Sequence, residues 1–537
     1  MLAVPFALAG PAPEAGAVVA VLLVACALVA RSDRMRALAM SGALLLAPVL
    51  LVSDIWDSPQ MEVVRDHSGA ALAAAAVGLV ALSLLATLMA RQPLLLPVLT
   101  VAALPFRIPI EVGGSTSNLL VPLYLVVAAG ALAFIVPALR ADPEAPPPPR
   151  AWQPGWLERL LALFIVLYGV QATYSADFEK ALQQIAFFYV PFALLFVLLA
   201  QIDWTPRLLR WCFGVLVGLA LIFSGIGYVE YLTRHIFLNP KLIASNELHT
   251  YFRTNSVFFD PNIYGRFLVV AMLAVAATLL HTRRRELLIG GSIVLAALWA
   301  GLVLTLSQSS FVALLVGLAT LAVLAWGVRR TLLPTLAVVL VAGAAVLITP
   351  STFGIDLNNL DASTSGRSGL VTSGGSLFAD RPLQGFGSGA FEAEYRDRNG
   401  REGGDAAATS HTIPVTVASE QGVIGLIAYL ALLAAAFARL LRGAAGTPAR
   451  AFVAAAFLAL IVHTLIYAAF LEDPLTWALL GIGTALAAQV VREPRRRRAG
   501  AAASVAAAQE LSDGSALPKP GAAGGRRLTT DSSLPAT

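Results

Sequence analysis

Side chains that could carry out phosphate or acid–base chemistry gather in three segments, residues 251–268, 361–391 and 410–426. The segments carry, in chain order, Arg253, Asp260, Asn262 and Arg266, then Arg367 and Arg381, then His411 and Glu420. Guanidinium groups suit the oxygens of a diphosphate, because their paired planar donors match phosphate geometry and stay charged. A histidine suits proton abstraction near neutral pH. The three segments are therefore the first candidates for a site.

Each group also has a more ordinary interpretation. An arginine in a loop is most often solvated or faces lipid headgroups. The glycines Gly385, Gly387 and Gly389 resemble a phosphate cradle only superficially, since no strand precedes them, and they favour a tight loop turn. Gly422 and Gly425 are typical of close helix packing in lipid.

Polar residues inside or between the apolar runs are also open to two interpretations. Ser307 and Ser309 either support the site or form only the polar turn of a helical hairpin. His463 lies deep in an apolar run, and we expect a neutral histidine hydrogen-bonded across helices. The two cysteines, Cys26 and Cys212, lie in apolar runs and are expected to be packing residues.

The elements that position these groups are predicted to be membrane spans. Of the 537 residues, 58% are hydrophobic and 13% are charged, against about 25% charged residues in a soluble domain. This composition excludes a soluble enzyme, a disulfide scaffold and, despite the net charge of +5, a DNA-binding factor. We predict an all-α polytopic membrane protein, a bundle of about 12–15 transmembrane helices with one long extracytoplasmic loop.

Hydropathy windows of about 19 residues give fifteen candidate spans. They cover residues 15–30, 37–53, 69–90, 92–106, 117–139, 156–173, 181–200, 209–232, 261–280, 287–306, 309–328, 331–349, 414–438, 451–470 and 474–491. The run 287–328 is divided at the polar residues Ser307 to Ser310, and the span 92–106 carries two prolines. The first run has no basic region before it, so we expect a retained span and not a cleaved signal peptide.

Basic residues accumulate in every second loop, which predicts an orientation. With the N-terminus outside and the C-terminus in the cytoplasm, the short inner loops hold 17 basic residues and the short outer loops hold 7. Lys and Arg are enriched on the cytoplasmic side of short loops. The three polar segments then lie at the outer face of the membrane.

The predicted organisation has four parts. Residues 1–349 form an N-terminal transmembrane bundle, 350–413 a long extracytoplasmic loop, 414–491 the C-terminal transmembrane helices, and 492–537 a disordered basic cytoplasmic tail. The arginines of the tail are expected to hold it near anionic lipid. A proline-rich inner linker is predicted at 141–150.

The order of the motifs resembles the O-antigen ligase and polymerase family, the bacterial membrane glycosyltransferases that move glycans from a polyprenyl diphosphate carrier. The stretches are LPFRIPIEVGGSTSNLLVPLYL (104–125), FFDPNIYGRFL (258–268), LTLSQSSFVALLVGL (304–318), and RPLQGFGSGAF (381–391) followed by SHTIPVTVASEQGVIGL (410–426). The resemblance spans residues 90–490. Two positions depart from the family pattern. Gln308 stands where arginine is frequent, and Thr412 where asparagine is common, which indicates a divergent subfamily.

The resemblance implies an inverting transferase in the bacterial cytoplasmic membrane that needs no metal, nucleotide or other cofactor. Its partners would be a polyprenyl-diphosphate-linked glycan donor, an acceptor that is a glycan, a lipid or a protein, and membrane lipids, with no nucleic acid. It implies that loop arginines hold the diphosphate and that the loop histidine, His411, serves the acceptor. Our first choices for the diphosphate are Arg253 and Arg367, with Arg266 and Arg381 behind them, and we expect support from Asn262, Glu420, Ser307 and Ser309. Glu420 is expected to brace an arginine or a helix end.

Two other classes of function remain open. A transporter or flippase could move a lipid-linked glycan or a small solute without bond chemistry, but transporters usually keep ionisable residues in the middle of their spans. Here most such residues lie near span ends: Glu158, Arg159, Glu230, Arg266 and Glu420. A structural or sensory membrane protein would use the 350–413 loop for binding alone.

Overall fold

The computed structural model describes residues 12–54, 56, 59–112, 115–142, 153–238, 242–243, 246–247, 251–348, 367–399, 412–467 and 469–490. Contacts divide the chain into two units, Met1–Ala488 and Gln489–Thr537, and the fold below is that of the first unit. Nearly all of the predicted linker at 141–150 and the whole predicted tail at 492–537 lie outside the described residues. The same holds for much of the predicted long loop at 350–413.

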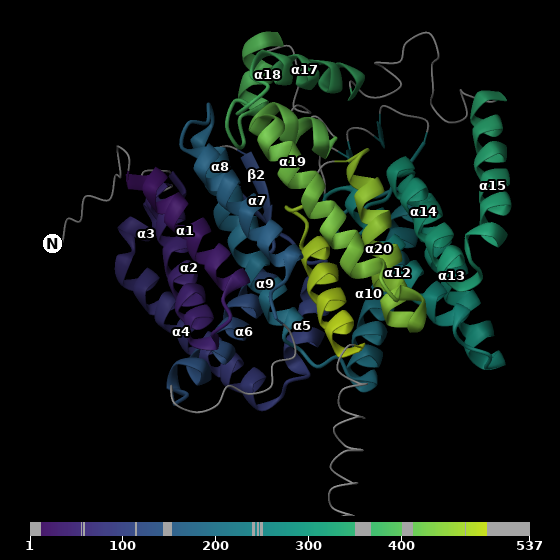
Figure 1. Cartoon of the computed structure of the whole chain (residues 1–537), viewed down its shortest axis with the longest axis horizontal. Helices are drawn as coiled ribbons and strands as arrows, with labels where there is room; N and C mark the ends of the chain where they lie inside the picture. Colours follow the sequence, from purple (N-terminus) through teal and green to yellow (C-terminus); the bar gives the residue numbers. More distant parts are fainter. Residues whose placement is uncertain are drawn as a thin grey trace, which may run out of the picture. The chain divides into compact units, whose positions relative to one another are not determined.

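The regular secondary structure of the described residues is helical apart from one two-stranded hairpin (Figure 1). The elements are α1 Ala12–Val29, α2 Asp33–Asp54, α3 Pro59–Asp66, α4 Ser68–Arg91, α5 Leu95–Ala103, β1 Ile108–Val112, β2 Ser115–Leu119, α6 Val121–Arg140, α7 Trp156–Ala172, α8 Phe178–Gln184, the π-helix η1 Ile185–Tyr189, α9 Val190–Ala200, α10 Pro206–Thr233, α12 Pro261–Leu280, α13 Arg285–Thr305, α14 Gln308–Trp326, α15 Val328–Ile348, α17 Arg367–Asp380, α18 Phe391–Asn399, α19 Ile413–Leu441, the 3₁₀-helix η3 Ala444–Gly446 and α20 Pro448–Thr464. A further helix, Pro474–Val490, follows α20.

The helical membrane architecture predicted from the sequence is confirmed. Ten helices among the described residues are long and apolar enough to cross a membrane, and Pro448–Thr464 and Pro474–Val490 are shorter apolar helices. The helix within the predicted span at 92–106 is shorter than predicted. The helix there, α5, has nine residues, and at 1.5 Å per residue it covers about 13 Å of a ~30 Å hydrocarbon core. The antiparallel hairpin β1–β2, which pairs Ile108 with Leu119, follows it.

Local sequence explains where the central helices begin. Asp260 caps α12, since its side chain accepts a hydrogen bond from the Asn262 N–H at 2.6 Å, and Pro261 occupies the first turn. Ser307 caps α14 in the same way by accepting from the Ser310 N–H. The predicted division of the 287–328 run is thereby confirmed.

Helix α12 lies at the centre of the packing around the site. It contacts α10, α13, α14 and α20, and most of its residues are buried. Gly265 lets α14 approach closely, because a Cβ at this position would lie 2.5 Å from Ser310 Oγ. Small residues at such crossings are typical of helix packing in lipid.

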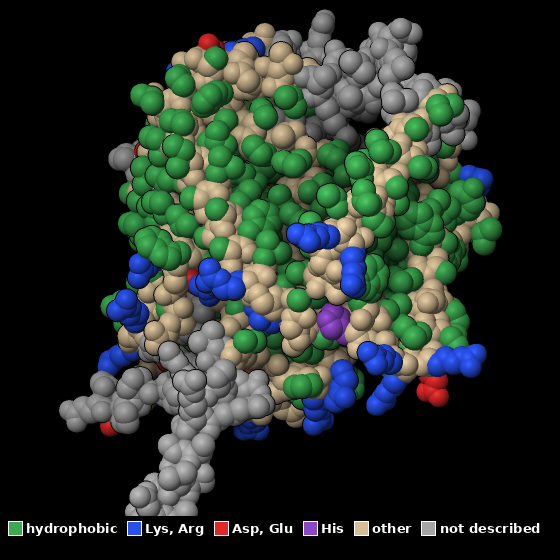
Figure 2. Space-filling model, turned by 45° about the vertical axis from the view of Figure 1, so that its right-hand side comes forward, with side chains coloured by type: hydrophobic (Ala, Val, Ile, Leu, Met, Phe, Trp, Pro, Cys, Tyr) green, Lys and Arg blue, Asp and Glu red, His purple; other side chains and the backbone are tan. Residues whose placement is uncertain are grey.

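Hydrophobic side chains cover the lateral surface of the bundle. Figure 2 shows them across the middle of one face, with Lys and Arg side chains gathered along its lower margin. Large exposed apolar residues such as Leu79, Leu84 and Ile293 belong to this surface. A protein in water rarely exposes so large an apolar area, whereas a surface in contact with lipid requires it.

Candidate functional site

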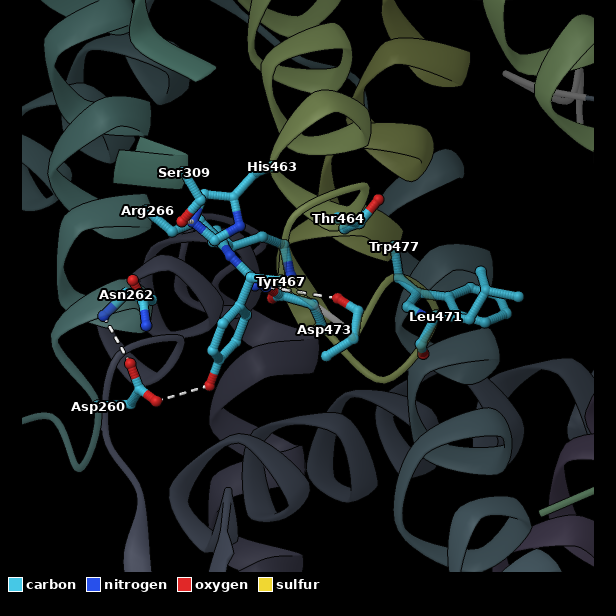
Figure 3. Close-up of polar contacts among 12 residues, drawn as sticks. Asp260, Asn262, Arg266, Ser309, His463, Thr464, Tyr467, Leu471, Asp473 and Trp477 are labelled. Atoms are coloured by element: carbon cyan, nitrogen blue, oxygen red, sulfur yellow. Dashed lines mark hydrogen bonds and ion pairs between the residues drawn. The ribbon is translucent and has the colours of Figure 1, made fainter. Parts of the chain in front are cut away.

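Polar residues from three distant parts of the chain meet at the start of α12. They form what we call the α12 cluster: Asp260, Asn262, Arg266, Ser307, Ser309, Ser310, His463, Tyr467 and Asp473. Figure 3 shows seven of them as labelled sticks. The cluster joins two motifs that were predicted from the sequence, at 258–268 and 304–318, with the turn between α20 and the Pro474–Val490 helix.

One half of the cluster is a chain of hydrogen bonds between α12 and α14. Ser307 Oγ donates to Asn262 Oδ1 at 2.8 Å, and it also lies 2.8 Å from Ser310 Oγ and 3.2 Å from Ser309 Oγ. The three serines are buried. Because a buried hydroxyl is costly unless it is hydrogen-bonded, this network fixes the turn between α13 and α14.

His463 extends the same network to α20. Its Nε2 lies 3.1 Å from Ser309 Oγ and 3.3 Å from Ser310 Oγ, and the side chain has no exposed surface. The cross-helix hydrogen bonding expected for this histidine is confirmed. Its ring also lies 5.7 Å from the Tyr467 ring, so it joins the serines of α14 to the turn after α20.

The other half of the cluster is charged. Arg266 is buried in an ion pair with Asp473, and its Nη1 donates to the Ala469 carbonyl at 3.4 Å. Its guanidinium also lies 5.4 Å from the centre of the Tyr467 ring. A buried guanidinium paired in this way links α12 firmly to the turn after α20.

Asp260 and Tyr467 complete this side. The Tyr467 hydroxyl donates to Asp260 Oδ2 at 2.8 Å (Figure 3). Burial, together with the neighbouring Asp260 carboxylate, raises the pKa of Tyr467 above its ordinary value. The phenol therefore stays protonated and acts as a hydrogen-bond donor.

Arg253 lies beside the turn that holds Ser307, Ser309 and Ser310, which we call the serine turn. Its Nε donates to the Thr305 carbonyl at 3.0 Å, and Thr305 Oγ1 accepts from the Ser307 N–H at 3.1 Å. The Asn246 side chain holds the Arg253 backbone through two hydrogen bonds of 3.0 Å. The structure thus brings Arg253 to the turn that carries the supporting serines.

A buried carboxylate holds the segment that follows Arg253. Glu230, near the end of α10, accepts hydrogen bonds from the backbone N–H groups of Asn255 and Ser256 at 3.2 and 2.8 Å. Its side chain has no exposed surface. The sequence alone places Glu230 only near a span end, because its partners lie 25 and 26 residues away in a loop.

The remaining predicted arginines and the histidine are placed differently. Arg381 is exposed, with its guanidinium 4.3 Å from the centre of the Phe386 ring, and no contact among the described residues joins it to the α12 cluster. Arg367 is the first residue of α17. His411 lies outside the described residues. The next residue, Thr412, donates from Oγ1 to the Leu465 carbonyl at 3.1 Å, so the start of α19 is tied to the end of α20.

The glycine-rich loop before α18 packs against a break in α19. Gly385, Gly387 and Gly389 all have positive φ angles, of 69°, 97° and 80°, which confirms the predicted tight turn. A Cβ at Gly385 would lie 2.3 Å from the Glu420 carbonyl oxygen, and one at Gly387 would lie 2.4 Å from the Cα of Ser175. Side chains at these positions would therefore separate the loop from the bundle.

The interpretation of Gly422 as a packing residue is wrong. Its φ of 65° and ψ of −164° break α19, a conformation that glycine adopts without strain. The break frees backbone groups that the glycine-rich loop satisfies. Phe386 and Gly387 donate to the Ser419 and Glu420 carbonyls at 3.2 and 2.8 Å, and the Val423 N–H donates to the Pro382 carbonyl at 2.8 Å.

Glu420 lies at this break. Its Oε1 accepts a hydrogen bond from the Phe391 N–H at 3.2 Å, which caps the start of α18. Glu420 was expected to brace either an arginine or a helix end, and this hydrogen bond is a contact with a helix end. No group of three or more His, Cys, Asp or Glu side chains in the described part of the chain is arranged to hold a metal ion.

An apolar cavity of about 340 Å³ lies below the Arg266–Asp473 ion pair. Its walls come from α5, α10, α12, α20 and the Pro474–Val490 helix. On α12 the lining residues Val270, Ala274 and Thr278 follow Arg266 at intervals of four, so they continue the helix face that carries the guanidinium. On the other wall the lining begins at Leu475, two residues after Asp473.

The comparison with protein families gives a match for part of the chain. Residues 291–430 match a family model described as O-antigen ligase. The matched segment includes the serine turn, the glycine-rich loop and the start of α19, but not the motifs at 104–125 and 258–268. No curated protein matches the chain.

Proposed function

We propose that this membrane protein is a glycosyltransferase, because its residues 291–430 match the O-antigen ligase family. It moves a glycan from a polyprenyl diphosphate carrier to an acceptor hydroxyl at the outer face of the cytoplasmic membrane. The observation that carries the proposal is the α12 cluster. It brings a serine turn of the matched domain, Asn262 and the nearby Arg253 together above an apolar cavity.

The orientation proposed is an outer N-terminus and a cytoplasmic C-terminus. Its support is the excess of 17 basic residues over 7 in the short loops. In this orientation the 233–260 connection is on the outer side of the membrane. The α12 cluster lies at the start of α12, directly after this connection, and is therefore at the outer face. A reporter fused after Arg498 should be cytoplasmic, and one inserted near Asn399 should be outside. Both reporters on one side would contradict this orientation.

The apolar cavity supports a lipid donor. A polyprenyl diphosphate has a charged head and a long hydrocarbon tail, and the cavity continues the face of α12 that carries Arg266. The tail would lie in the cavity or between the neighbouring spans, where burial of hydrocarbon is favourable. The head would lie above it, at the level of the cluster.

The chemical step is a displacement at the anomeric carbon. An acceptor oxygen forms the new bond to this carbon while the bond to the diphosphate oxygen breaks, and the diphosphate leaves with the electron pair. Attack from the opposite face inverts the configuration. His411 takes the proton of the acceptor hydroxyl. Since diphosphate is already a good leaving group, the larger need is to neutralise the charge that develops on it.

Arg253 and Arg367 are the proposed diphosphate ligands. The bond from Arg253 Nε to the Thr305 carbonyl fixes the plane of this guanidinium at the serine turn, and preorganised donors stabilise a leaving group best. Asn262, Ser307 and Ser309 support this arrangement through their hydrogen bonds. Glu420 supports it from the loop side, by holding the start of α18.

Arg266 and Arg381 take secondary roles in this proposal. Asp473 already neutralises Arg266, so a diphosphate would have to displace that carboxylate before Arg266 could bind it. Arg381 stacks on Phe386 in an exposed position, from which it could meet the head of an arriving donor.

The test is a transfer assay in liposomes that contain the full-length protein, a lipid-diphosphate glycan and candidate acceptors. We expect a glycosylated acceptor together with released polyprenyl diphosphate. Movement of intact lipid-linked glycan between leaflets without release would indicate a flippase and overturn the proposal. Binding without either event would indicate a sensory or structural role.

A further inference from the structure

A second, smaller cavity lies beneath the glycine-rich loop and is not used by the mechanism above. It has a volume of about 50 Å³ and lies between α7, α8, the first half of α19 and the turn before the Pro474–Val490 helix. Its polar lining includes Lys180, Glu420, Gln421, Tyr429 and Glu472. Lys180 and Glu472 are half-buried, whereas the other three are buried, so the cavity deepens from the first pair toward the second group.

Two polar groups in the deep part have no partner among the described residues. They are Gln421 Oε1 and the Tyr429 hydroxyl. Both side chains are 1% exposed, and both line the cavity. Because buried polar atoms are nearly always hydrogen-bonded in folded proteins, these two atoms indicate a site that is completed by a polar ligand.

The charges of the lining restrict the ligand. The cavity holds one ammonium group and two carboxyl groups, because Lys180, Glu420 and Glu472 all line it. Lys180 interacts electrostatically with both glutamates. With two acidic groups against one ammonium group, such a lining does not suit a phosphate or a diphosphate. It offers both donors and acceptors, and aromatic residues, among them Tyr168 and Phe470, form part of the wall. Hydroxyl groups on a compact ring match this combination, which is the chemistry of a neutral sugar.

The size of the cavity restricts the ligand further. One water-sized group needs about 10–15 Å³ of such space, so a volume of about 50 Å³ admits three to five hydroxyl-sized groups. The cavity therefore holds one hydroxyl-bearing edge of a single sugar unit. The rest of a glycan would lie outside it.

The cavity adjoins the α12 cluster. Leu471 and Glu472 line it, and the next residue, Asp473, is paired with Arg266. Ile413 also lines it, at the first turn of α19. The turn before the Pro474–Val490 helix is thus a wall shared by the small cavity and the cluster.

We propose that this cavity is a sugar subsite that binds one neutral sugar unit of the acceptor, and the assignment to the acceptor rests on the proposed function. The first sugar of the donor has the same chemistry. It is bonded directly to the diphosphate, however, and would bring that charge toward Glu420 and Glu472. The acceptor brings no such charge.

The first experiment measures binding without transfer. Saturation-transfer NMR is recorded on the full-length protein in nanodiscs with glucose, galactose, mannose and N-acetylglucosamine as probes. We expect at least one sugar to bind, and Tyr429→Phe to weaken its binding about three- to tenfold, as for the loss of one hydrogen bond. The matched control is Tyr124→Phe in α6, which removes a tyrosine hydroxyl that also has no hydrogen-bond partner among the described residues and lies outside the cavity. It should leave sugar binding unchanged. No binding by any probe, or equal binding by Tyr429→Phe, would overturn the subsite.

The second experiment assigns the source of the sugar. In the liposome assay, Tyr429→Phe should raise the acceptor KM three- to tenfold and leave the donor KM and kcat unchanged. A rise in the donor KM alone would overturn the acceptor assignment. Because the NMR measurement needs no transfer, a failure of the proposed enzymatic function remains distinguishable from a failure of the subsite.

Discussion

Replacing Asp473 by Asn tests the buried ion pair on which the α12 cluster depends. The side chains of Arg266 and Asp473 are 2% and 4% exposed, so the substitution leaves a guanidinium charge buried without its carboxylate. Removing one partner of a buried pair costs about 3–5 kcal/mol. Asn can still accept the Leu475 N–H bond that Asp473 Oδ1 accepts at 2.9 Å, so the loss comes from the charge.

The expected magnitude lies at the lower end of this range. Arg266 keeps the Ala469 carbonyl and the face of Tyr467 as neighbours, and these partly compensate the charge. We therefore expect Asp473→Asn to lower the free energy of unfolding by about 3 kcal/mol. The assay is denaturant unfolding of the purified protein in mild detergent. Adding Arg266→Met should restore part of the loss, because it removes the uncompensated charge.

A matched control exists on the surface. Asp380 pairs with Arg398, and their side chains are 56% and 31% exposed. Asp380→Asn should change the free energy of unfolding by less than about 1 kcal/mol, as is usual for exposed ion pairs. Equal effects of Asp473→Asn and Asp380→Asn, both below about 1 kcal/mol, would refute the conclusion that the Arg266–Asp473 pair holds the cluster together.

Three further predictions concern the site and its support. Replacing Arg253 or Arg367 by Ala should lower transfer about ten- to a hundredfold, with only partial rescue by Lys, because each change removes charge-assisted hydrogen bonds to the diphosphate; full transfer by the double Ala variant would contradict the clamp. His411→Ala should lower transfer by about 10²–10⁴-fold. In the unmodified protein, transfer should slow as the pH falls below about 6.5, the reference pKa of histidine, because a protonated imidazole cannot accept a proton. The control His463→Ala should lower the free energy of unfolding, since it removes the bonds to the serine turn. If His411→Ala transferred glycan at the parental rate and His463→Ala did not, the catalytic base would have to lie within the bundle. Gly422→Ala should detach the glycine-rich loop from α19, because a Cβ there would lie 2.2 Å from the Leu383 carbonyl oxygen, and limited proteolysis near Leu383 should become faster.

The sequence predicts the local features of this fold well, because they depend on neighbouring residues. Asp260 and Pro261 specify the start of α12, and Ser307 specifies the start of α14. The apolar runs predict the helices that follow. The glycines at 385, 387 and 389 predict a turn, since few other residues adopt positive φ.

The partners of the cluster could not be predicted, because they depend on how distant helices pack. Asp473 lies 207 positions from Arg266, and Tyr467 lies 207 positions from Asp260. A weak signal was present in the polar residues of LEDP (471–474), which interrupt the apolar sequence between two helices. Gly422 was misassigned because its spacing from Gly425 also fits helix packing, and only the backbone distinguishes the two roles.

The break in α19 has a consequence for how the glycine-rich loop exchanges its amide hydrogens. The N–H groups of Phe386 and Gly387 are bonded to carbonyls of α19, and the Val423 N–H is bonded to a carbonyl of the loop. Exchange at these three amides therefore requires the loop and the helix to separate together, as one cooperative unit. Although they belong to or adjoin a loop, these amides should exchange with deuterium as slowly as those of the spans, and at nearly identical rates.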